Sequence, residues 1–276
     1  MSKEHWTDEK LFLRLQNNKS QKYYWDYISI LRKRTTKEVF EKSTLLIQNG
    51  NSKDKIIGID ILAQLGIRPR PFLKQTIKLF FKLLENESSS KVLKSLLIGI
   101  GHNNEKLTSH QIAKLAEFCK SKSNDIKEGL IFSLLTVNHP KAIDCLINLS
   151  SDKAYFIRDW ATFGLGTQIN ADNEEIRKAL WERVNDKHQE TKLEAILGLA
   201  KRKDERIKPF IVKELLSGEY GFVLFEAIEE IGDKENLKVL KDYYKSQKGN
   251  SKIPTEWLFD LKSCIKTLEG KLKKSE

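Results

Sequence analysis

The chain has 276 residues, of which 39% are hydrophobic and 32% charged, and its formal net charge is +11. It contains no apolar run of about 18 residues and no charged stretch followed by an apolar one at its start, which argues against a membrane span and a secretory signal. Its 14 Gly and 5 Pro suit an all-helical protein, and three cysteines without CxxC spacing predict buried thiols in the reducing cytoplasm.

The first 36 residues are expected to form an N-terminal helical cap. Segments 8–17 and 21–33 are predicted helices, and the second holds an aromatic cluster of Tyr23, Tyr24, Trp25 and Tyr27. We expect two of these rings to cover the first repeat and the other two to stay half exposed.

Residues 37–245 repeat one helical pattern. Six similar stretches are separated by steps of 35, 34, 31, 34 and 32 residues, and they end at Gly66, Gly101, Leu135, Gly166, Ala200 and Gly232. Self-similarity at this period is typical of a stacked helical repeat, in which each unit contacts its neighbours.

Three columns of the repeat are apolar, one, four and five positions before each end point. These offsets mark one face of an α-helix, and the single exception is Thr162. Each such inner helix follows an amphipathic segment that we interpret as the outer helix of a pair, at 37–49, 70–85, 108–121, 140–150, 173–185 and 206–217.

Pro209 and the end of the chain complete the expected elements. Pro209 lies about a turn inside its predicted helix and should bend it. Helices at 235–246 and 254–273 follow the last repeat, so residues 246–276 are expected to be a C-terminal capping helix with a basic tail, Lys271 to Lys274, that frays into solvent.

The positive charge is concentrated at the ends. Residues 1–36 carry 8 basic and 4 acidic side chains, residues 262–276 carry 5 and 2, and the body between them therefore holds only +4. Arg supplies 10 of the 49 basic residues, although planar contacts to phosphates or base edges favour Arg over Lys. Charge alone is thus weak support for nucleic-acid binding.

Three segments carry a family resemblance. Residues 157–166, 192–200 and 60–66, which read IRDWATFGLG, KLEAILGLA and DILAQLG, resemble bacterial HEAT-repeat proteins of the phycobilisome-lyase-like type. The resemblance covers about 37–245 and implies an all-α fold, an α-solenoid or superhelix of about six to seven HEAT-like helix pairs. It says little about function, because such repeats occur in adaptors, lyases, hydroxylases and glycosylases alike.

The resemblance also implies a ladder of charges between repeats, with an Asp ahead of the inner helix and a basic residue six positions later. Asp152 with Arg158 and Asp186 with Lys192 match this pattern, whereas Lys127 keeps only the basic half. The equivalent basic positions in the other copies hold Gly58, Leu93 and Leu224, so we expect the ladder only in the middle of the stack.

Lys127, Arg158 and Lys192 are equivalent in three successive inner helices. They could form a groove for an acidic peptide or a phosphate backbone, but we favour the ladder. Trp160 stands where the other copies have polar or small residues. It is either an interface anchor or a ring that fills the gap left by the 31-residue step.

Asp159 and Glu128 are equivalent carboxylates that could serve acid–base chemistry, although acids in a first helical turn commonly just favour the helix dipole. We expect no catalytic residue, no metal and no cofactor. His5, His102, His110, His139 and His188 all lack the following Glu that the HEAT-type deoxyhypusine hydroxylases use to hold iron, and no Gly-rich phosphate loop is present.

These observations favour a cytoplasmic, monomeric, non-catalytic scaffold or adaptor that binds a protein on its concave face. The candidate binding residues are Lys127, Glu128, Arg158, Asp159, Trp160 and Lys192. The alternative is a nucleic-acid-binding solenoid that resembles the HEAT-like alkylpurine glycosylases, and a chromophore lyase is less favoured. Arg158, Asp159 and Trp160 supply the residue types of such a glycosylase, but consecutive helical residues point about 100° apart and cannot all face one base.

Overall fold

The structure is a computed structural model that describes residues 3–217 and 222–274, and within these ranges it contains helices and loops but no strand. The chain divides into two compact units, Met1–Ala142 and Ile143–Glu276, which are described separately. The elements confirm an all-α fold built from HEAT-like helix pairs.

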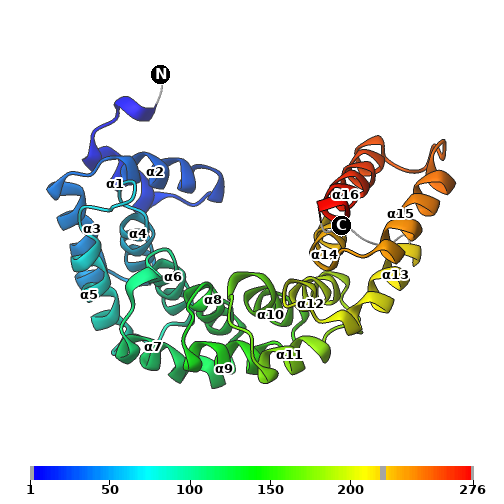
Figure 1. Ribbon diagram of the computed structural model, residues 1–276. Coiled ribbons are helices and arrows are strands. Elements are labelled where there is room, and N and C mark those ends of the chain that lie inside the picture. Colours follow the sequence, from blue (N-terminus) through cyan, green and yellow to red (C-terminus); the bar gives the residue numbers. More distant parts are fainter. Residues whose placement is uncertain (1–2, 218–221, 275–276) are drawn as a thin grey trace. The chain divides into compact units, whose positions relative to one another are not determined.

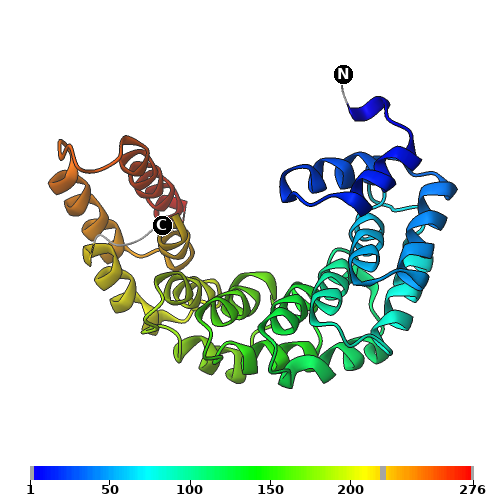
Figure 2. The same ribbon diagram turned by 180° about the vertical axis from the view of Figure 1, so that it is seen from behind.

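In the first unit, the column-bearing helices lie side by side in one layer and the preceding helices form a second layer (Figures 1 and 2). The inner layer holds α2 (Gln21–Lys33), α4 (Ser52–Ala63), α6 (Ser90–Gly101) and α8 (Asn124–Leu134). The outer helices are α3 (Lys37–Asn49), α5 (Leu73–Leu84) and α7 (Ser109–Ala116), and α1 (Asp8–Asn17) packs on α2 and α4. Short 3₁₀ turns η1 (Lys3–His5), η2 (Asn104–Lys106) and η3 (Glu117–Lys120) complete this part.

The second unit repeats the same two-layer arrangement. Its inner helices are α10 (Tyr155–Phe163), which continues as the π-helical turn η4 (Gly164–Gln168), then α12 (Gln189–Lys201), α14 (Phe222–Ile231) and α16 (Thr255–Lys274). Its outer helices are α11 (Glu174–Trp181), α13 (Lys208–Ser217), which follows η5 (Glu205–Ile207), and α15 (Lys234–Gln247). Helix α9 (Pro140–Leu149) begins in the first unit and ends in the second.

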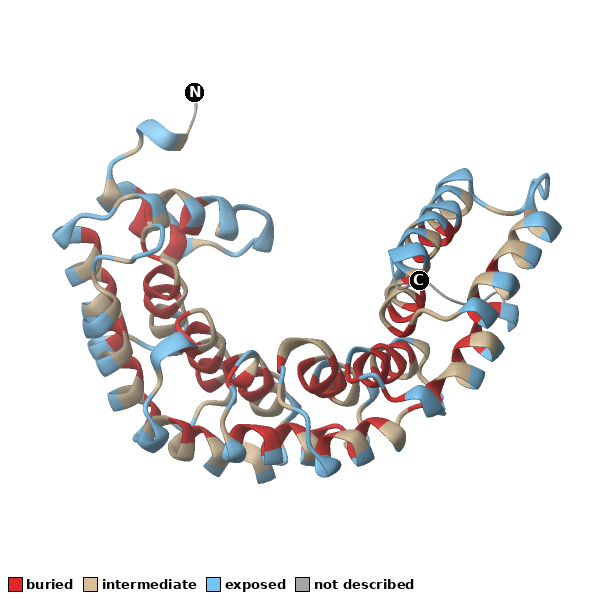
Figure 3. Ribbon diagram, in the orientation of Figure 1, coloured by how far each residue is buried: buried red, intermediate tan, exposed pale blue. Residues whose placement is uncertain are grey.

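All three apolar columns are buried, as the repeat predicts, and Figure 3 shows the buried positions along the helices. Thr162, the exception, is also fully buried, and its hydroxyl donates a hydrogen bond to the carbonyl of Arg158 at 2.7 Å. A buried hydroxyl with a partner costs little, so the column tolerates it.

The aromatic cluster at the start is half exposed, as predicted. Tyr23 and Trp25 are 42% and 50% exposed, whereas Tyr27 is buried. The Tyr24 hydroxyl donates to Asp60 of α4 at 2.6 Å, but the Tyr27 ring stacks on that of Trp6, with centroids 5.8 Å apart. Of the two covered rings, Tyr24 thus contacts the first repeat and Tyr27 contacts the N-terminal segment.

Several expectations were wrong in detail. Pro209 is the second residue of α13 and not a turn inside it, so its missing N–H costs no hydrogen bond and it need not bend the helix. The run Lys271 to Lys274 is the last turn of α16 and not a frayed tail, because Lys271 Nζ donates to the carbonyl of Glu229 at 2.9 Å. Cys145 and Cys264 are buried, but Cys119 is only partly so.

Successive inner helices of the second unit meet at backbone distance. A Cβ atom added to Gly198 of α12 would lie 2.6 Å from Cα of Gly166 in η4, so neither position has room for a side chain. Beside this contact, the buried guanidinium of Arg202 donates to the carbonyls of Gly166 and Gly198 and, through Nη2, to that of Leu165 at 2.7 Å. Arg202 thereby satisfies carbonyls that the end of the π-helical turn leaves free.

We predict that Gly198→Ala destabilises the protein by about 2–3 kcal/mol, because the new methyl group forces two backbones apart. The control is Gly270→Ala, since nothing lies within 4 Å of a Cβ at that position in α16. It should instead stabilise the helix by about 0.5–1 kcal/mol through propensity. Urea unfolding followed by circular dichroism measures both, and equal effects would contradict the close packing.

Candidate partner-binding surface

An aromatic and acidic surface lies on the inner helices of the second unit. Trp160 of α10 is 36% exposed, and its ring meets that of Phe163 edge to face at 5.6 Å. On the same helix Tyr155 is 57% exposed, with its ring 4.6 Å from that of His188. Trp160 is therefore partly exposed, as its polar column predicts.

Two half-buried carboxylates belong to this surface. Burial raises the pKa of Glu194 to about 7, and the nearby charges of Asp159 and Glu226 add to the effect. Glu194 Oε2 is buried and finds no hydrogen-bond donor among the residues that the structure describes. Burial also raises the pKa of Asp159, and the hydrogen bond that it accepts from the Thr191 hydroxyl is long at 3.5 Å. The surface thus holds negative charge that the chain itself does not neutralise well.

Arg158 and Lys192 take part in ion pairs between repeats. Arg158 Nε and Nη2 each lie 2.9 Å from a carboxylate oxygen of Asp186, and Lys192 Nζ lies 3.0 Å from Glu214. Burial by itself would raise the pKa of Asp186, but the hydrogen bonds from Arg158 and the N–H of His188 hold it below its ordinary value. Each basic residue therefore pairs with an acid that follows it in the chain.

The remaining two candidates, Lys127 and Glu128, lie on α8 in the first unit. Glu128 accepts from Lys94 Nζ at 2.9 Å, and the same ammonium lies 3.2 Å from Asp125. Glu128 therefore already has a cationic partner, which is a structural role and does not suggest a catalytic acid.

The ladder is not confined to the middle of the stack, contrary to our expectation. Lys55 of α4 pairs with Glu87 at 2.7 Å, and Glu87 occupies the acidic position of the next repeat. The basic residue stands three positions earlier than in the family pattern, so one turn of helix separates it from Gly58. Because Lys55 lies outside the column that Gly58 occupies, the repeat pattern did not predict this pair.

Glu194 is the functional candidate that sequence reasoning missed. It belongs to the same polar column as Trp160 and Glu226, a column that the repeat alignment displays. The repeat pattern does not show that this carboxylate is buried without a hydrogen-bond donor, because that depends on how neighbouring helices pack.

Two observations on the described residues concern metal binding and membrane spans. No group of three or more His, Cys, Asp or Glu side chains within 3–217 and 222–274 could hold a metal ion. Over the same ranges, no helix has the length and apolar character needed to cross a membrane.

The repeated helix pairs define a protein of the α-helical repeat class. No protein-family model matches the chain. A segment of 120 residues, 43% of the chain, is 37% identical to Protein YibA of Escherichia coli strain K12 and equally to that of strain O157:H7. The match spans only 42% of the length of these relatives.

A crystal structure of E. coli YibA aligns over 96% of this chain and 93% of its own, with a TM-score of 0.73 and 24% identity. This similarity extends the shared fold to nearly the whole chain. Human deoxyhypusine hydroxylase aligns with a TM-score of only 0.35 at 13% identity, which is too low to support an argument.

We predict that Glu194→Gln stabilises the protein in a pH-dependent way. The folded-state pKa of about 7 exceeds the ordinary value of 4.5, so wild type loses stability as the pH rises from 4.5 to 7. The amide removes this loss, and we expect a gain of about 1–2 kcal/mol at pH 8 and almost none at pH 4.5. Urea titrations at both pH values measure it. Glu190→Gln, an exposed control on α12, should show no such difference.

We predict that Arg158→Ala destabilises the protein by about 2 kcal/mol, because the Asp186 side chain is only 6% exposed and loses its bidentate partner. Arg183, 3.4 Å from Asp186, limits the loss. A double-mutant cycle with Asp186→Ala should give a coupling of about 1–2 kcal/mol. A coupling near zero would mean that Arg158 does not act through this ion pair.

Proposed function

We propose that this chain is a non-catalytic HEAT-repeat scaffold or adaptor, and that it binds a basic segment of a protein partner on the inner face of its second unit. The single observation that carries the proposal is the exposed ring of Trp160 beside the underpaired carboxylates Asp159 and Glu194. Residues 37–245 serve as the repeat body in this proposal, with residues 1–36 and 246–276 as its caps.

A Lys or Arg side chain is the ligand that suits this surface. An ammonium or guanidinium group close to these half-buried carboxylates favours the ionised form of both. The neighbouring indole can stack on the cation or on its apolar stem. Trp and Tyr are also the residues most often found as anchors in protein interfaces.

The alternatives receive less support. A nucleic-acid-binding face needs cations for phosphates, but Arg158 and Lys192 are held by Asp186 and Glu214. Acid–base catalysis is also less favoured, because Glu128 is paired with Lys94. A chromophore lyase rests on the repeat resemblance alone.

The experiment is site-specific photo-cross-linking in the native cell. A photoreactive amino acid replaces Trp160 in one strain and Phe259, which is 70% exposed on α16, in a control strain. We expect a discrete cross-linked protein from position 160 and none from 259. Cross-links that are absent or identical at the two positions would contradict the proposal.

The identified partner then allows a quantitative prediction. Trp160→Ala with Glu194→Gln should weaken binding by about 100-fold with unchanged helical content, because an anchor and a charge contact are lost together. Phe259→Ala should change it less than about twofold. Because the cation pairs with ionised Glu194, affinity measured by calorimetry should rise between pH 6 and pH 8. An affinity that falls over this range would exclude a basic ligand at Glu194.

A further inference from the structure

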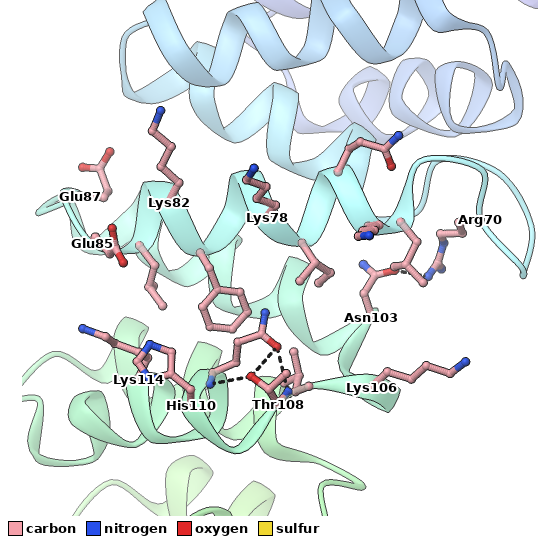
Figure 4. A pocket seen from close by; sticks show the side chains of 18 of the residues that line it. Arg70, Lys78, Lys82, Glu85, Glu87, Asn103, Lys106, Thr108, His110 and Lys114 are labelled. Atoms are coloured by element: carbon pink, nitrogen blue, oxygen red, sulfur yellow. Dashed lines mark hydrogen bonds between the residues drawn. The ribbon is translucent and has the colours of Figure 1, made fainter.

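The first unit has an open groove between its outer helices α5 and α7. The cavity measures about 1250 Å³ (Figure 4). We propose that this groove binds an amphipathic α-helix of a partner protein that carries acidic side chains along one edge. This proposal concerns a different surface from the inner face of the second unit, and it does not depend on the function proposed there.

The floor of the groove is apolar. Helix α5 contributes Leu73, Ile77 and Phe81, whose four-residue spacing forms one stripe along the helix. This stripe is separate from the one that packs into the core, where the Phe80 ring lies against Gly99 of α6. Helix α5 therefore presents more apolar surface than its own repeat covers.

The two flanks of α5 differ. Toward α3, the ring of Phe72 stacks on that of Phe40 with centroids 4.5 Å apart, so aromatic side chains fill that junction. Toward α7, the half-buried Ile77 and Phe81 border the cavity instead. The groove is thus a place where the outer layer has room for another element.

Cations border this apolar floor. Lys74, Lys78 and Lys82 are exposed and follow each other at four-residue spacing, and none has a carboxylate partner among the described residues. In Figure 4, Lys78 and Lys82 extend from α5 on the side away from α7, and Lys106 and Lys114 lie on the α7 side of the groove. The carboxylates Glu85 and Glu87 also line the groove, near the end of α5. Four residues, a rise of about 6 Å, separate successive lysines on α5, so the three form a row about 12 Å long.

A row of cations at helical spacing beside an apolar floor matches one ligand chemistry best. A fatty acid or detergent has a single charged head and can use only one of the three lysines. A nucleic acid has many charges but no apolar face for Ile77 and Phe81. An α-helix with Asp or Glu at i, i+4 and i+8 and an adjacent Leu or Phe stripe satisfies both features at once.

The length and charge of the first unit agree with this occupant. Helix α5 has 12 residues, about 18 Å, so the groove suits about three turns of helix. Residues 1–142 contain 25 Lys and Arg against 14 Asp and Glu, whereas the remainder of the chain contains 24 of each. The whole net charge of +11 thus belongs to the first unit, which attracts an acidic partner during encounter.

The probe is a synthetic, fluorescein-labelled 16-residue helical peptide with Leu on one stripe and Glu along its edge. Fluorescence anisotropy against the full chain measures affinity. Two control peptides have the same composition in scrambled order, or Lys in place of each Glu. We expect the acidic amphipathic peptide to bind at least about tenfold more tightly than either control. Equal binding of the scrambled peptide would overturn the proposal, because only non-specific attraction would remain.

Protein variants locate the binding. Lys74→Glu with Lys78→Glu and Lys82→Glu should weaken binding by about tenfold or more, because each exposed ion pair contributes a factor of roughly two to three. The matched control reverses three exposed lysines on outer helices of the second unit, Lys178→Glu, Lys213→Glu and Lys238→Glu, and should change binding less than about twofold. If both triple variants lose binding equally, net charge and not the groove is responsible.

Two further measurements test the assignment. Hydrogen exchange should show protection by the peptide in residues 73–84 and 107–118, and protection confined to other segments would overturn the proposal. Duplex DNA or dodecyl sulfate should compete only weakly, whereas stoichiometric displacement by either at lower concentration would show a different ligand class. Trp160→Ala should leave this peptide's affinity unchanged, which separates the result from that for the inner face.

Discussion

The close approach of successive inner helices is the constraint on which the rest of the second unit depends. At Gly166 and Gly198 the two backbones touch without an intervening side chain, and Arg202 ties together the carbonyls on both sides of the contact. Helices held this near each other bring Asp159 of α10 and Glu194 of α12 into the same electrostatic environment. The unusual pKa of Glu194 follows from that packing, because the carboxylate is half-buried near the charges of Asp159 and Glu226.

Charged residues in this protein fall into two groups with different roles. Arg158, Lys192, Lys55 and Lys94 pair with acids of the following repeat and stabilise the stack. Glu194 lacks such a partner, and Lys74, Lys78 and Lys82 lack one among the described residues. Burial of a charge without a partner costs free energy, which is why the pKa of the half-buried Glu194 is raised. The three lysines are exposed and carry no such cost. Under the two proposals these groups bind a partner, whereas the paired residues stabilise the fold.

The two units offer surfaces of opposite character. The second unit has an acidic and aromatic inner face that suits a basic segment, and the first has an apolar groove bordered by lysines that suits an acidic helix. A repeat protein can carry such different surfaces because each helix pair contacts only its neighbours, so the exposed positions of one repeat change without disturbing another. The net charge of +11 belongs to the first unit, so it does not describe the inner face of the second.

The sequence by itself determined the all-α class, the period, the buried columns and the positions of nearly every helix. Each of these depends on local periodicity, and even the exposure of Trp160 follows from its polar column. Only the tertiary structure decided which acid pairs with each basic residue, that Pro209 begins its helix, that Glu194 is left without a donor, and that a groove lies between α5 and α7. The ion pairs, the carboxylate without a donor and the groove depend on distances between helices some 30 residues apart in the chain. Small differences in packing and loop length set those distances, and the repeat pattern does not record them.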